Sequence, residues 1–281
     1  MLHLPFAVLL IYLLGNHVIN CLLGTTPSIQ KRTCFSIMRN LLLFLALVGI
    51  FVVGKRSCQG FSFGFPGSGI NGSGAVKTEP RSVSDFHAID LSLAGDVEFS
   101  VSDHYSVEVQ AQENLLPILK TEVENGKLKI YFSENVRQSQ DIKIRVSAPS
   151  FEALELAGSG TMRAMTAIKS SRMSMEVSGS GNLYLSQGEF GEVDCAISGS
   201  GGIELGGTAN TLKVDVSGSG EVQAKELTTN SLDAEVAGSG TISCHVVQTL
   251  KADIAGSGEV FYSGTPTVDA DVSGSGKVKR L

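Results

Sequence analysis

The tripeptide Gly-Ser-Gly occurs seven times within residues 158–276, at intervals of 18 to 21 residues. A near-constant interval of this length is typical of solenoid proteins, in which each repeat buries its apolar face by stacking on its neighbours. We therefore predict that each tripeptide forms a corner at the same place in successive repeats. The predicted structural corners are Gly158, Ser159 and Gly160, then Gly179 and Gly181, Gly199 and Gly201, Gly218 and Gly220, Gly238 and Gly240, Gly256 and Gly258, and Gly274 and Gly276.

The residues on either side of each tripeptide alternate between apolar and polar. Before the fourth tripeptide, the apolar positions are Val216, Val214 and Leu212, and the residues between them are Asp215 and Lys213. Strict alternation over six residues indicates a β-strand with one buried face. The alternation resumes after the tripeptide, so each repeat reads as strand, bend, strand and a variable connection.

This repeat unit predicts an all-β fold, a parallel β-helix with coils of about 20 residues. A barrel of hairpins would show turn signals every 8 to 12 residues. A flexible Gly/Ser linker is excluded because the apolar phase never slips between repeats. Glycine suits the corners because a sharp bend needs φ values that a side chain with a Cβ disfavours.

The predicted β-helix domain covers residues 86–281, with regular repeats over 151–281. Residues 86–150 carry strand patterning without the clean period, and we expect irregular N-terminal coils that cap the solenoid there. About eight to ten coils, one strand spacing apart, would make a domain some 40–50 Å long.

The segments before residue 86 indicate export. Residues 38–57 read as a signal peptide or membrane anchor, with a basic start and an apolar run. Residues 1–37 are then an upstream artefact or an extra apolar segment. Residues 58–85 read as a Gly/Ser/Phe-rich tether, and lipidation at Cys58 stays open. We expect an exported protein in the periplasm, in the outer membrane or at the cell surface.

The sequence also predicts a column of acidic residues on the outer surface. Six of the seven residues that stand three positions before a corner are acidic, and stacking would place them about 4.8 Å apart. Carboxylates this close could bind Ca²⁺ or form a solvated face relieved by nearby lysines. The nonapeptide calcium repeat is not matched, since here the acids precede the glycines. The acidic column consists of Glu155, Glu176, Asp215, Glu235, Asp253 and Asp271.

Composition and motifs argue against several function classes. The net charge of −6 and the absence of a basic patch make nucleic acid an unexpected partner. Polysaccharide cleavage needs paired carboxylates in defined contact, whereas these acids repeat once per coil like a structural pattern. The five histidines show no metal-ligand spacing. We therefore expect no catalytic residue, metal or cofactor, with Ca²⁺ kept as an alternative.

The sequence resembles the bacterial family of the putative auto-transporter adhesin, head GIN domain. The resemblance rests on FHAIDLSLAGDVEF at 86–99, VEVQAQENLL at 107–116, APSFEALELAGSG at 148–160 and the iterated VSGSG. It implies a right-handed β-helix of the pectin-lyase-like kind, export to the cell envelope and an adhesion role. It implies no catalytic residue, and no functional residue can be carried over from it.

These observations lead to a functional expectation with two alternatives. We expect a non-catalytic envelope module that presents a rigid β-helix surface to a macromolecular partner, either a glycan or a host or envelope protein. One alternative is a polysaccharide-active enzyme, which would show a pair of acids beside an aromatic ring. The other is a structural protein, a homo-oligomer that assembles through the edges of its coils.

Overall fold

The computed structural model describes residues 69–140 and 142–281. The predicted signal or anchor at 38–57, the segment 1–37 and residues 58–68 of the expected tether, Cys58 among them, lie outside the described residues. The described part contains strands and no helix.

The described chain forms 20 β-strands. The strands before the first Gly-Ser-Gly corner are β1 (Ile70–Asn71), β2 (Val76–Arg81), β3 (Ala88–Ser92), β4 (Asp96–Val101), β5 (Ser106–Gln112), β6 (Leu119–Glu124), β7 (Lys127–Phe132), β8 (Val136–Gln138), β9 (Lys143–Ala148) and β10 (Ala153–Gly158). Those that follow are β11 (Thr161–Ala164), β12 (Ile168–Gly179), β13 (Asn182–Leu185), β14 (Gly188–Gly199), β15 (Gly202–Gly218), β16 (Glu221–Gly238), β17 (Thr241–Gly256), β18 (Glu259–Gly264), β19 (Thr267–Gly274) and β20 (Lys277–Arg280).

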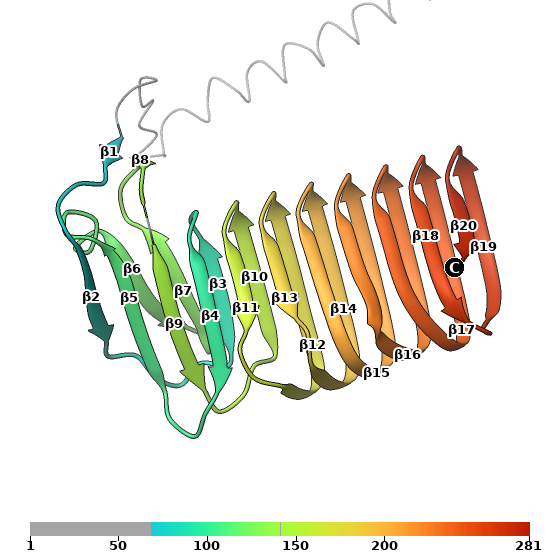
Figure 1. The fold of residues 1–281 in the computed structure, drawn as a ribbon, viewed down its shortest axis with the longest axis horizontal. Coiled ribbons are helices and arrows are strands. Elements are labelled where there is room, and N and C mark those ends of the chain that lie inside the picture. Colours follow the sequence, from blue (N-terminus) through green and yellow to red (C-terminus); the bar gives the residue numbers. More distant parts are fainter. Residues whose placement is uncertain (1–68, 141) are drawn as a thin grey trace, which may run out of the picture. The chain divides into compact units, whose positions relative to one another are not determined.

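From β10 onward the chain winds as a parallel β-solenoid of about six turns, which stack side by side in Figure 1. Each turn has two flat sides joined at the Gly-Ser-Gly corner. Sheet A consists of the strand segments that lead into the corners, and sheet B of the segments that leave them. In both sheets every strand pairs in parallel with the equivalent strand of the next turn.

The core lies between the two sheets and consists of the residues that the alternation assigns to the inside. In the turn around Gly218, Leu212, Val216 and Val222 are completely buried, and Val214 is 2% exposed. Their register partners in the neighbouring turns are buried as well. The predicted inward and outward phase is therefore confirmed.

The corners require glycine for two physical reasons. The first glycine of each tripeptide has a positive φ, between 124° and 130°, which side chains with a Cβ rarely adopt. A Cβ on Gly218 would also lie 2.5 Å from the carbonyl oxygen of Gly199 in the preceding turn. The amide of the central serine continues the ladder, as Ser219 N–H donates to that same oxygen at 2.8 Å.

The N-terminal part departs from simple coils. Strands β3 and β4 form a turn that pairs in parallel with β10 and β11, and on its other side with β7 and β9. Strands that come later in the chain thus lie outside an earlier turn. Antiparallel strands then close both sheets: β6 pairs with β7, β5 with β9, and β2 with β5. We call residues 69–151, which include this β3–β4 turn, the cap.

Two expectations need correction here. Fewer regular turns form than the expected eight to ten coils, because much of 101–150 makes antiparallel strands instead. The expected tether also ends earlier than residue 85. Residues 76–81 form β2, which bonds to the outer edge of β5, and β1 pairs with β8. Strand β2 thus gives that edge of β5 a partner, so this stretch is part of the fold.

Candidate functional site

The outer surface of sheet A carries the predicted acidic residues in one line. Register pairs Glu155 with Glu176, Asp215 with Glu235, and Asp253 with Asp271, and Ala196 stands between the first two pairs. The geometry therefore brings all six predicted residues together, and we call them the acid column. The register therefore stacks a carboxylate in each of these turns except the one that carries Ala196.

The acid column has one member that the predicted set lacks. Asp90 on β3 is in register with Glu155, so the column continues into the turn before the first Gly-Ser-Gly corner. The corner after β3 is Leu93-Ala94-Gly95, without the tripeptide that defined the column in the sequence. The signal available was the likeness of Ala88-Ile89-Asp90-Leu91 to Ala153-Leu154-Glu155-Leu156.

A second column, two residues before the acid column in each strand, has charges of alternating sign. Cross-strand pairs of opposite charge stabilise a sheet by about 0.2–1 kcal/mol each, and like charges oppose it. The Nζ of Lys251 accordingly lies 3.7 Å from Asp233 Oδ1 and 2.7 Å from Asp253 Oδ2. In register order this alternating column is Ser174, Asp194, Lys213, Asp233, Lys251 and Asp269.

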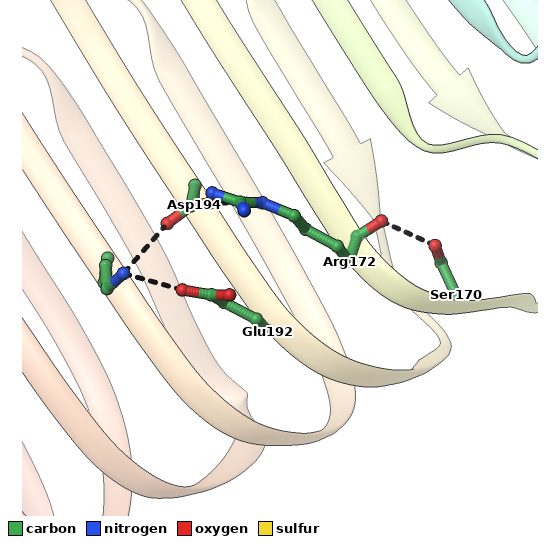
Figure 2. Close-up of polar contacts among 5 residues, drawn as sticks. Ser170, Arg172, Glu192 and Asp194 are labelled. Carbon is green, nitrogen blue, oxygen red and sulfur yellow. Dashed lines mark hydrogen bonds and ion pairs between the residues drawn. The ribbon is translucent and has the colours of Figure 1, made fainter.

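Ion pairs near the start of the regular turns run across three strands (Figure 2). The guanidinium of Arg172 donates to Asp194 Oδ2 at 2.7 and 3.1 Å, and Ser170 Oγ donates to the carbonyl oxygen of Arg172. The ammonium of Lys213 donates to Glu192 Oε1 at 2.6 Å. The hydrogen bond from Lys213 lowers the pKa of Glu192, and the bond to Asp194 raises the pKa of Arg172.

The acid column is compensated much less completely than the alternating column. Lys127 pairs with Glu155 and Lys251 with Asp253. Within the described residues, no cationic group lies within ion-pair distance of the other four predicted members, which are Glu176, Asp215, Glu235 and Asp271. Sheet A therefore presents a row of negative charge that the described part of the protein does not neutralise.

The acid column borders a shallow depression that we call the trough. One hollow of about 240 Å³ is lined by Asp215, Glu235, Asp253, Asp271 and the small residues beside the corners. A second, of about 290 Å³, continues past Glu176 and shares two of these acids. The first hollow runs beside the small residues that precede the corners, Ala237, Ala255 and Ser273, whereas the second is lined by Ala196 and by residues of the alternating column.

The trough lacks what polysaccharide cleavage was expected to show. No aromatic side chain is among the residues that line either hollow. The aromatic residues of the turns lie elsewhere: Tyr184 is on sheet B, where Arg163 covers its ring with 4.0 Å between the guanidinium carbon and the ring centroid. A carboxylate pair with an adjacent sugar-stacking ring, the expected mark of the enzyme alternative, is therefore missing from the trough.

Other reactive groups in the described part do not form a constellation. His245 Nδ1 lies 2.8 Å from Ser263 Oγ, and no hydrogen bond or ion pair from a carboxylate to His245 is found in the described chain. Cys195 and Cys244 are buried free thiols in the core. Burial raises the pKa of the Cys244 thiol to about 12, so it stays protonated at neutral pH.

Two further properties concern only residues 69–140 and 142–281. No three or more His, Cys, Asp or Glu side chains there converge in a way that could hold a metal ion. Within the same residues there is also no helix of the length and apolarity needed to cross a membrane.

Comparison with solved structures identifies the fold. A putative adhesin from Bacteroides fragilis NCTC 9343 has a TM-score of 0.71 at 22% identity, over 76% of this chain and 100% of that chain. A putative lipid binding protein from Parabacteroides distasonis ATCC 8503 has a TM-score of 0.66 at 28% identity, over 76% and 100%. A putative adhesin from the same organism has a TM-score of 0.62 at 24% identity, over 76% and 100%.

Comparison at the sequence level gives one match and one negative result. No curated protein matches the chain. A family model matches residues 85–266, which include the β3–β4 turn, the regular turns and the corners. The chain belongs to the family described as putative auto-transporter adhesin, head GIN domain.

Proposed function

We propose that the protein is a non-catalytic adhesion module of the cell envelope, which binds a macromolecular partner along the trough of sheet A. Membership of an adhesin family and the adhesin-like solved structures support an exported protein with an adhesion-like role rather than an enzyme. The observation that carries the proposal is the row of carboxylates on a flat, rigid sheet, four of which have no ion-pair partner in the described structure.

The charge of the trough specifies the chemistry of the partner. Carboxylates spaced by one strand attract a partner with a matching row of positive charge, such as a lysine-rich protein segment or a glycan with amino groups. Each exposed ion pair contributes little, about 0–1 kcal/mol. Affinity would therefore come from many such contacts along a surface that needs no rearrangement to bind.

Ca²⁺ and a lipid are two alternative partners that the outcomes described below distinguish from a cationic one. Ca²⁺ takes several carboxylate oxygens, and the acid column offers the trough one carboxylate in each turn except that of Ala196. The structurally similar Parabacteroides distasonis protein described as lipid binding suggests a lipid partner. Against a lipid within the fold, the space between the sheets is filled by side chains of 0–2% exposure, such as Leu212 and Val216.

The test is a binding measurement with the full chain on an array of glycans and matrix proteins, with polylysine as the cationic probe. Asp215→Asn with Glu235→Gln removes two trough charges that have no ion-pair partner in the described structure. Glu204→Gln with Glu221→Gln removes two exposed charges from sheet B and serves as the matched control. We expect about tenfold weaker binding in the trough variant, strong salt dependence, and no change in the control.

Each of the other possible outcomes would support a different alternative to this proposal. Equal loss in both variants would contradict the assignment to the trough and indicate an effect of net charge alone. Binding or thermal stabilisation that a chelator abolishes would replace the proposal with a calcium site. Binding to vesicles that both variants retain would favour a lipid partner. Release of new reducing ends from a polysaccharide would overturn the non-catalytic assignment.

A further inference from the structure

The last described turn, formed by β19 and β20, leaves one edge of each sheet without a strand partner. Strand β19 is bonded to β17 on one side, and β20 to β18 on one side. Among residues 69–140 and 142–281, no strand pairs with their other edges. Such an edge carries a row of unpaired N–H and C=O groups and readily pairs with another chain.

The inward side chains of this turn are also uncovered. Val268 and Val272 are 38% and 37% exposed, whereas their register partners Leu250 and Ile254 are 1% and 2% exposed. The apolar alternation of the earlier turns therefore continues into a layer that the described residues leave open to solvent. A covering layer would have to supply both strand edges and apolar side chains between them.

The charges on the two free edges are opposite. The outward side chains of β19 include Asp269 and Asp271, and those of β20 are Lys277 and Lys279. Asp269 and Asp271 have no ion pair in the described part of the chain, and Lys279 has one, with Glu259 of the preceding turn at 3.0 Å. The free end thus consists of an acidic edge and a basic edge around an apolar strip.

From these three features we infer that a second copy of the chain covers this end, with β19 of one copy paired antiparallel to β20 of the other. The two strands flank a corner and so run in opposite directions. A two-fold axis parallel to them then places β19 on β20 in both halves of the contact. This arrangement places the aspartates of one copy opposite the lysines of the other on the outer surface, and the apolar strips of the two copies pack together inside.

The other two-fold arrangement is disfavoured by charge. An axis perpendicular to the strands would pair β19 with β19 and β20 with β20, which sets aspartates against aspartates and lysines against lysines. Like charges directly opposite across a strand pair are destabilising. The charge pattern therefore favours pairing of β19 with β20 over pairing of each strand with its own copy, and with it the two-fold axis parallel to the strands.

The contact also bears on the proposed adhesion function, although it does not depend on it. The selected two-fold rotation exchanges the positions of sheets A and B, so the troughs of the two copies would lie on opposite sides of the pair. A pair of this kind could bridge two surfaces that each carry the cationic partner.

The experiment measures the mass of the full chain by light scattering and sedimentation over a range of concentrations, in one non-ionic detergent for all variants. We expect the unmodified chain to form a dimer. Asp269→Lys with Asp271→Lys makes both edges basic, and Lys277→Glu with Lys279→Glu makes both acidic. Each of these double variants should dimerise at least about tenfold more weakly.

Two rescue measurements test the pairing itself. Mixing the two double variants should restore a heterodimer, and the chain with all four reversals should again form a homodimer. Asp215→Lys, a charge reversal in the middle of the acid column, is the control and should dimerise normally. Hydrogen exchange should show amides of β19 protected in the dimer and exposed in the double variants.

Three results would overturn the inference. The unmodified chain could be a monomer at every concentration. The double variants could associate as well as the unmodified chain, which would place the contact elsewhere. The variant with all four charge reversals could fail to form a dimer although its circular dichroism and melting stay native, which would exclude the pairing of aspartates on β19 with lysines on β20.

Discussion

The two ends of the solenoid are closed in different ways. At the N-terminal end the cap adds antiparallel strands to both sheets, and large side chains fill the space between them. The rings of Phe99 and Phe151 meet edge to face there, with centroids 5.1 Å apart. At the other end, β19 and β20 repeat the preceding turn, and Val272 is left partly exposed.

This difference separates two sources of stability. A regular turn contacts only the turns before and after it, so its stability is a nearest-neighbour property. The cap instead joins segments that are far apart in the chain, such as β2 with β5 and β4 with β9. Damage to a turn should therefore stay partly local, whereas damage to the cap should lower the stability of every turn built on it.

The largest effect is expected from a charge in the core of the turns. Val214→Asp buries a carboxylate at a position that is 2% exposed, among aliphatic neighbours. An unpaired buried charge costs several kcal/mol, so the turns around β15 should unfold while the cap keeps its protected amides. Circular dichroism and hydrogen exchange measure the two parts separately.

Two controls make this prediction specific to the inside of the coil. Ser217→Asp places the same charge at an exposed position of the same strand, and Ser219→Ala removes the hydroxyl from a corner. Both variants should melt close to the unmodified chain. Equal melting of Val214→Asp and these controls would contradict the inward and outward phase.

A slightly smaller but more widespread effect is expected in the cap. Phe151 is fully buried against Phe99, and truncation of a buried phenylalanine costs about 3–5 kcal/mol. Phe151→Ala should lower the melting temperature of the whole domain in a single transition. Leu212→Ala, a comparable truncation inside the turns, is the control. If both variants unfolded the cap and the turns together, the proposed division of stability would be wrong.

A moderate effect is expected at the corners. Gly238 has a φ of 128°, and a Cβ there would lie 2.5 Å from the carbonyl oxygen of Gly218. Gly238→Ala should therefore destabilise the domain by about 1–3 kcal/mol in a denaturant titration.

Gly202→Ala is the matched substitution at the first residue of β15, directly after a corner. Its backbone has no positive φ, and the nearest atom to its Cβ is Asn182 Oδ1, the end of a side chain that can move. We expect a clearly smaller loss of stability there. A loss as large as that of Gly238→Ala would show that crowding, rather than φ, sets the requirement for glycine.

The regular turns could be predicted from the sequence, and the cap could not, for a physical reason. Between Gly158 and Gly276 each strand pairs with the strand one repeat away, so the period alone fixes the register. In the cap, β7 lies outside β3 although it follows β3 in the chain. That placement depends on non-local packing, which local alternation does not encode.

The same contrast applies to the candidate site. The acid column follows from register alone, so Glu155 to Asp271 could be placed from the sequence. The trough depends in addition on the shape of the surface, which becomes visible only in three dimensions. Asp90 was missed because the corner after β3 lacks the tripeptide.

The smallest effect is expected from the exposed ion pair between Lys213 and Glu192. Because the bond from Lys213 lowers the pKa of Glu192, the folded state binds this proton less readily than the unfolded chain does. The stabilisation is therefore present above the ordinary pKa of a glutamate and is lost as the pH falls through the lowered value. Melting temperatures of the unmodified chain and of Glu192→Gln should differ slightly at pH 7 and converge in acid, below the lowered pKa of Glu192. Glu204→Gln, on sheet B and without an ion pair in the described structure, is the control and should melt close to the unmodified chain at pH 7. A gap between the unmodified chain and Glu192→Gln that persists in acid would mean that the glutamate acts through packing rather than charge, and the turns would then owe this part of their stability to the same kind of contact as the cap.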